Sequence, residues 1–216
     1  MLLAPGQKAN VDGYTIRYAR PTESVSSQKI SFGAVLDVSK AGKHVTTVTT
    51  TRSFYPSQDP TTGIVGRFFS GNSDSEVGLD AGLRRDIWTV IDVDPTHLQA
   101  LTDQADKLFA AYAPQVMTRA KSQPPAQAAQ TMNAFWTERD LAVAEIARRF
   151  VTHPWSSEFL LIVDPLVTWI WLGALIIGGG GLIALWPVPS LARRRAAVPK
   201  SARPSASPGV PVREPA

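Results

Sequence analysis

The pattern of hydrophobic and polar residues divides the chain into four segments. Residues 1–94 carry short runs of β-branched residues between turn residues, and residues 95–158 carry apolar residues at helical spacing. Residues 159–187 contain a long uncharged run, and residues 188–216 have no periodic apolar pattern. We therefore expect a β-domain, an amphipathic helical hairpin, a transmembrane helix and a disordered basic tail, in that order.

The first segment predicts a small antiparallel barrel or sandwich. Ala41-Gly42 separates two of its runs as a hairpin turn would. Six short strands in about 90 residues are enough to close one core. The expected strands cover residues 14–19, 29–39, 43–54, 64–69, 76–79 and 86–92.

The second segment predicts two helices inserted after the strands. Asp94 and Pro95 are typical of an N-cap and a first helical position, and we expect the first helix to end at about Ala113, before Pro114. The second helix should stop before His153. Its apolar face comprises Met132, Phe135, Trp136, Val143, Ile146, Ala147 and Phe150. This hairpin either packs on the β-domain, lies along a membrane surface, or forms a groove that docks a partner.

The run from Leu166 to Trp186 predicts a membrane span. It has 21 residues and no charge, and as a helix it would be about 31 Å long, which matches the hydrocarbon core of a bilayer. Trp169 and Trp171 lie near one end and Trp186 lies at the other, as in an aromatic belt.

The glycines of this run favour close helix packing. A phosphate-binding loop would need a strand before the glycines and usually a lysine, and the run has neither. Ala174 and Gly178 form a small-xxx-small pair, which lets another helix approach closely. We expect this span to lie beside partner helices.

Charge is distributed unevenly along the chain. Residues 1–165 have 16 Lys and Arg against 17 Asp and Glu, whereas residues 166–216 have 6 against 1. Basic residues confined to a tail argue against a nucleic-acid binder. By the positive-inside rule the C-terminus is cytoplasmic, so the N-terminal domain should be extracytoplasmic on a plasma (inner) membrane.

Export of that domain needs an explanation. The first ten residues have neither a basic segment nor an apolar one, so they do not form a signal peptide. We expect an earlier transmembrane helix to precede Met1 in a longer, polytopic protein. The alternative is that the domain crosses the membrane behind its own C-terminal span.

Candidate chemistry is sparse. The chain has no cysteine, which excludes disulfides and thiolate chemistry. His44, His97 and His153 have neither the spacing nor the partners of metal ligands, so a structural role is favoured for each. We identify no catalytic, metal-binding or cofactor-binding residue in the sequence.

Particular residues resemble a known family. The run from Val163 to Gly173, VDPLVTWIWLG, continued by LIALWP up to Pro187, closely resembles the "NPLVxWIWLGG…GGLxALWP" ending of the CcmF-type subunit of cytochrome c haem lyase. Shorter similarities lie at residues 52–56, 75–79 and 84–90. Asp164 replaces the usual Asn, and the helical segment 95–152 departs from shorter family members. The signature and membrane-packing residues are Pro165, Leu166, Trp169, Trp171, Gly173, Gly178 and Trp186.

The resemblance implies a role in cytochrome c maturation. It implies a membrane protein that takes haem from a haem chaperone and helps to attach it to apocytochrome c, with other maturation subunits as partners. This chain would be the C-terminal portion, an extracytoplasmic docking domain with its anchor. The haem b that the family binds would have its ligands outside this chain. The alternative is a stand-alone, single-span adaptor or scaffold with no haem chemistry.

Overall fold

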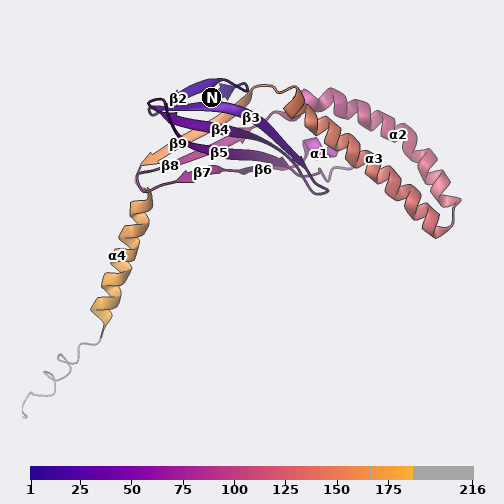
Figure 1. Ribbon diagram of the computed structural model, residues 1–216. Coiled ribbons are helices and arrows are strands. Elements are labelled where there is room, and N and C mark those ends of the chain that lie inside the picture. Colours follow the sequence, from indigo (N-terminus) through magenta and orange to yellow (C-terminus); the bar gives the residue numbers. More distant parts are fainter. Residues whose placement is uncertain (166, 187–216) are drawn as a thin grey trace, which may run out of the picture. The chain divides into compact units, whose positions relative to one another are not determined.

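The computed structural model describes residues 1–165 and 167–186. The described chain is mainly β, with one helical region and one apolar C-terminal helix (Figure 1). It divides into two compact units, Met1–Ile170 and Trp171–Ala216. The expected boundary between residues 94 and 95 is therefore not a domain boundary, because the strands and the helical hairpin share one unit.

Two antiparallel sheets form the β part of the first unit. The five-stranded sheet has the order β2-β3-β4-β5-β6, and the four-stranded sheet has the order β1-β9-β8-β7. The strands of the first sheet are β2 (Lys8–Val11), β3 (Tyr14–Val25), β4 (Ile30–Lys40), β5 (Lys43–Phe54) and β6 (Ser73–Glu76). Those of the second are β1 (Leu2–Leu3), β7 (Gly78–Ala81), β8 (Arg85–Asp92) and β9 (Ser157–Pro165).

Tight turns set the register of the long strands. The predicted hairpin at Ala41-Gly42 is confirmed, with φ values of 49° and 76°. Asp12 and Gly13, with the same two φ values, make a second turn of this kind between β2 and β3. Two consecutive positive φ values define the turn whose twist matches that of paired strands.

The two sheets share one core. Tyr14, Ile16 and Tyr18 alternate inward on β3, and Ile87 and Ile91 do the same on β8. The sheets also touch directly, because β5 lies beside both β7 and β8. The largest fully buried side chains of this core are Tyr18, Phe32, Phe150, Phe159, Ile16, Ile30, Leu36, Ile87, Ile91, Leu98, Val38 and Val65.

Residues 64–69 are not the strand that we expected. The chain turns there and forms the short helix α1 (Arg67–Ser70). Phe68 and Phe69 are both buried, which a half-exposed strand cannot achieve with neighbouring residues because they point to opposite faces. The carboxylate of Asp106 secures this segment by accepting hydrogen bonds from the backbone N–H groups of Val65, at 2.7 Å, and Gly66, at 3.0 Å.

The helical region is a hairpin of two long helices. A 3-10 turn (Pro95–Leu98) leads into α2 (Gln99–Lys121), which pairs with α3 (Pro125–Thr152) (Figure 1). The predicted cap is confirmed, since the Thr96 N–H donates to Asp94 at 2.9 Å. The predicted end at Ala113 is wrong, because Pro114 lies inside α2. Pro114 and Ala110 are exposed, so water can bind the carbonyl that loses its helical partner.

The apolar face of α3 packs on the strands at its C-terminal end. Phe150 is fully buried and its ring centroid lies 5.1 Å from that of Phe32 on β4. Farther from the strands, Phe135 packs against Phe109 of α2 at 5.6 Å. Three interpretations of this hairpin were left open. For the C-terminal half of α3, the structure shows packing on the β-domain.

Strand β9 corrects the expected start of the membrane segment. Residues 159–165 belong to the β-domain, where they pair with β8 from Glu158 to Pro165. Phe159 is buried in the core, and the aromatic rings of Phe159 and Tyr18 lie 5.1 Å apart. The apolar run before Pro165 is therefore a sheet strand, and the apolar helix begins after it.

Candidate functional site

The apolar helix α4 (Val167–Leu185) is the feature most directly connected with a membrane. It has 19 residues, a mean hydropathy of 1.8 and no buried residue among those described. A helix of that length rises about 28 Å, which is close to the thickness of the hydrocarbon core. By length and composition, α4 could span a membrane.

The family-signature residues fall on both sides of the start of this helix. Pro165 ends β9, and Trp169, Trp171, Gly173 and Gly178 lie on α4. Trp186 directly follows the helix. Leu166 lies outside the described residues, as does the basic tail from residue 187. These residues therefore follow one another along the chain, from the last strand into the apolar helix. Those that the structure describes do not line a common pocket.

The first turn of α4 is hydrogen-bonded to the turn between β7 and β8. The Thr168 hydroxyl donates to the carbonyl oxygen of Gly82 at 2.9 Å, and the Trp169 indole donates to the carbonyl oxygen of Leu83, also at 2.9 Å. The Leu83 side chain is 72% exposed. The carbonyl groups of Gly82 and Leu83 thus have hydrogen-bond partners at the start of α4.

Gly173 and Gly178 have open space where a side chain would begin. A Cβ added at Gly173 or Gly178 would have no atom within 4 Å. Within the described residues, glycine at these positions therefore fills no internal packing requirement. That the glycine face receives another helix stays a prediction.

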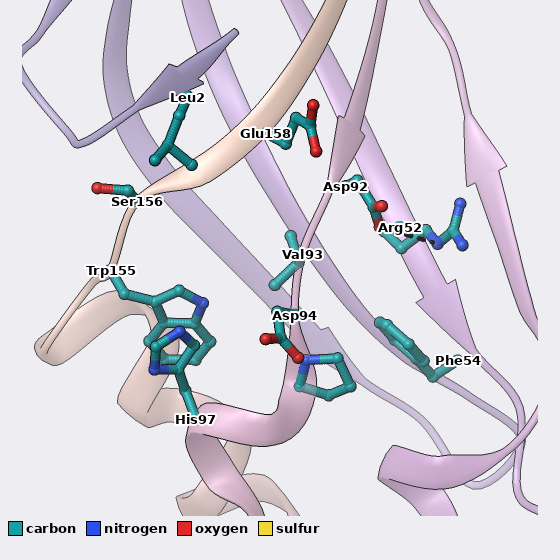
Figure 2. Close-up of a pocket in the computed structure, with 11 residues that line it drawn as sticks. Leu2, Arg52, Phe54, Asp92, Val93, Asp94, His97, Trp155, Ser156 and Glu158 are labelled. Carbon is teal, nitrogen blue, oxygen red and sulfur yellow. Dashed lines mark ion pairs between the residues drawn. The ribbon is translucent and has the colours of Figure 1, made fainter.

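A separate open cleft lies where the strands meet the helical hairpin. It has a volume of about 700 Å³. Figure 2 shows Trp155 and His97 together on one side and Arg52 beside Asp92 on the other. The residues that line it are Leu2, Arg52, Phe54, Asp92, Val93, Asp94, Pro95, His97, Trp155, Ser156 and Glu158.

Three charged residues of the cleft, Arg52, Asp92 and Asp94, have structural partners. Arg52 Nε lies 3.8 Å from Asp92 Oδ1. Both oxygens of Asp94 accept hydrogen bonds from Thr96, the first from the backbone N–H and the second from the hydroxyl at 2.8 Å. These bonds, the backbone one first, hold the pKa of the Asp94 carboxyl below its usual range. Asp94 is therefore an ionised helix cap, as predicted, and is poorly suited to accept a proton near neutral pH.

Two of the histidines, His97 and His153, make local contacts. The His97 ring stacks on Trp155 with ring centroids 5.0 Å apart, and His153 Nδ1 lies 3.0 Å from the Thr152 hydroxyl. His44 lies on β5. Across residues 1–165 and 167–186, no group of three or more His, Asp or Glu residues could hold a metal ion.

Sequence reasoning missed two parts of this region. Phe159, Leu161 and Val163 alternate on the inner face of β9, and this alternation could have predicted a strand. It was missed because the residues between them are also apolar. The attachment of α4 to the β7–β8 turn left no trace in the local sequence, because its partners are 86 residues apart.

Comparison with known proteins gives no relative for this chain. No family model, no curated protein and no solved structure matches it.

Proposed function

We propose that this chain is the C-terminal portion of a CcmF-type haem lyase subunit for cytochrome c maturation. In this proposal the β-domain, as a small barrel or sandwich outside the cytoplasm, docks partners, and α4 anchors it in the plasma (inner) membrane. The observation that carries the proposal is the run from Val163 to Gly173, whose order of residues resembles the ending of that family.

The geometry of that run supports an anchor joined closely to its domain. Pro165 is the last residue of β9 and Val167 is the first of α4, so one residue separates the strand from the helix. The bonds of Thr168 and Trp169 to the β7–β8 turn fasten the same junction. We propose that this short link keeps the docking domain next to its membrane anchor.

The proposed partners are apocytochrome c, a haem chaperone and other maturation subunits. Haem itself would be bound by parts of the family that have no counterpart in this chain. The described residues contribute a folded β-domain and an apolar helix to this proposal. The second candidate function is a single-span adaptor without haem chemistry, favoured by the same anchor and domain.

Deletion of the gene tests the proposal against this alternative. We expect membranes of the deletion strain to lose covalently bound haem on denaturing gels, while their b-type haem spectrum stays unchanged. Restoring the gene should restore the haem-stained bands. Unchanged covalent haem in the deletion strain would contradict the lyase role and favour the adaptor.

Orientation can be measured separately because the chain has no cysteine. A single cysteine at exposed Gln28, in the β3–β4 turn, should react with a membrane-impermeant maleimide in spheroplasts. A single cysteine at Ser205, in the basic tail, should react only after the membrane is opened. The reverse labelling pattern would place the β-domain in the cytoplasm and contradict the proposed topology.

A further inference from the structure

The turn between β7 and β8 carries an exposed leucine followed by an exposed arginine. Leu83 is 72% exposed. Arg84 is exposed as well, and within the described residues it forms no ion pair. Single exposed leucines are common on protein surfaces and do not by themselves indicate a binding site. What distinguishes Leu83 is its position next to the start of α4.

Two hydrogen bonds establish that position. The carbonyl oxygen of Gly82 accepts from the Thr168 hydroxyl, and that of Leu83 accepts from the Trp169 indole, each at 2.9 Å. Both donors lie in the first turn of α4, which begins at Val167. All of these residues belong to the compact unit Met1–Ile170. The backbone of Leu83 therefore lies at the level of Trp169.

The residues around Trp169 determine its depth in a membrane that α4 spans. From Ile170 to Leu185 the chain has no charged residue, and as a helix this stretch rises about 24 Å, most of the thickness of a hydrocarbon core. Asp164, five residues before Trp169, is a carboxylate that is costly to bury in lipid. An indole between two such segments favours the level of the lipid headgroups. The tip of the β7–β8 turn then lies at that level as well.

Internal bonds hold the shape of the turn. The Gly82 N–H donates to the Asp86 carboxylate at 2.9 Å, and the Arg85 guanidinium donates to Asp80 at 2.7 Å. The turn lies at the β7 edge of the four-stranded sheet, whereas β1 forms the opposite edge. A segment that lengthened β1 along β9 would therefore not cover Leu83.

We propose that the tip of the β7–β8 turn is a second membrane contact of this chain, beside α4. Leu83 inserts among the lipid chains just below the headgroups, and Arg84 binds lipid phosphate groups. The leucine is stabilised by leaving water, and a guanidinium can form two parallel hydrogen bonds with a phosphate. This inference rests on the proposed anchoring by α4 and not on the haem lyase role.

The test measures depth with a fluorescent label on the full chain in phospholipid nanodiscs. Because the chain has no cysteine, single variants Leu83→Cys, Leu175→Cys and Gln28→Cys can each carry one NBD dye. A nitroxide near the headgroup end of the lipid chains should quench the Leu83 label about twofold or more, and the Gln28 label less than about 1.2-fold. A nitroxide near the chain ends should quench the Leu175 label most, because that residue lies about 12 Å into the helix.

Matched charge variants test the phosphate contact. In the chain labelled at residue 83, Arg84→Glu should reduce the quenching by about half or more, because a carboxylate is repelled by lipid phosphates. Arg84→Lys keeps the charge and should retain most of the quenching. Arg20→Glu, at an exposed arginine on β3, should change nothing. Equal quenching in Arg84→Glu and the parent would overturn the role of Arg84. Circular dichroism confirms that each variant is folded.

Contact with lipid can be separated from contact with another protein. In native membranes, a diazirine-bearing residue in place of Leu83 should attach to phospholipid on irradiation, which mass spectrometry detects. Attachment to another protein alone would assign the turn to a partner and overturn the proposal. An unquenched Leu83 label beside a quenched Leu175 label would also overturn it, while leaving the α4 anchor intact. If the Leu175 label were unquenched too, both the anchor and this inference would fail.

Discussion

The indole Nε1 of Trp169 donates a hydrogen bond of 2.9 Å to the carbonyl oxygen of Leu83. The donor belongs to the first turn of the apolar helix, and the acceptor belongs to the turn between two strands of the β-domain. Together with the bond from Thr168 to Gly82, it joins the first turn of the helix to the β7–β8 turn. Sequence alone assigns Trp169 to an aromatic belt, and the structure adds this bonding role.

Trp169→Phe should loosen the β7–β8 turn while keeping an aromatic ring at the helix start. Loss of one neutral hydrogen bond costs about 1 kcal/mol, so we expect amide exchange in residues 82–85 to accelerate about fivefold. Hydrogen exchange with mass spectrometry in nanodiscs measures this. Trp171→Phe, at a side chain that is 71% exposed, is the matched control. Equal acceleration in both variants would show that the bond does not restrain the turn.

Asp106→Asn should destabilise the first unit. The carboxylate accepts backbone N–H bonds from Val65 and Gly66, and a Cβ at Gly63 would collide with it. An amide retains only one acceptor oxygen, so the free energy of unfolding should fall by about 1–2 kcal/mol. Urea unfolding of the detergent-solubilised chain measures this fall. Asp103→Asn, at an exposed neighbour on the same helix, should change stability by less than about 0.5 kcal/mol.

Much of the β-domain could be predicted from the sequence because its strands and turns depend on residues that are close together along the chain. Alternating β-branched residues and the Ala41-Gly42 turn locate β4 and β5. Each strand can thus be predicted from its own short run of residues, because turn residues and side-chain alternation act over a few positions. The arrangement of those strands in two sheets depends on contacts between distant residues.

The errors occurred where tertiary contacts override local preference. Phe68 and Phe69 read as part of a strand, yet both are buried in a helical turn that Asp106 secures from a distant helix. Pro114 read as a helix end, yet its exposed position lets the helix continue.

The glycines of α4 lead to a prediction about helix association. Gly178 has open space around its Cβ position, so Gly178→Leu should leave the isolated chain folded and disturb only contacts with another helix. We expect it to reduce recovery of partner subunits in a membrane pull-down severalfold more than Leu182→Ala, because a large side chain prevents close backbone approach. Equal loss of partners in the two variants would contradict a packing role for Gly178.

Asp94 should make the stability of the chain depend on pH. The bonds from Thr96 hold the pKa of its carboxyl below the usual range. A lowered pKa in the folded state means that the stabilisation is present above the unfolded pKa and is lost as pH falls through the folded pKa. Asp94→Ala should therefore lower the free energy of unfolding by about 0.5–1 kcal/mol at pH 7, and by much less at pH 2.

Asp94→Asn separates capping from charge in the same measurement. Asparagine is as good a cap as aspartate but does not ionise, so most of the stability at pH 7 should remain while this contribution to the pH dependence disappears. Urea unfolding at several pH values between 7 and 2 compares the three proteins. If Asp94→Ala were as stable as the parent at pH 7, or if its deficit persisted undiminished at pH 2, the ionised cap would not be the source of the effect.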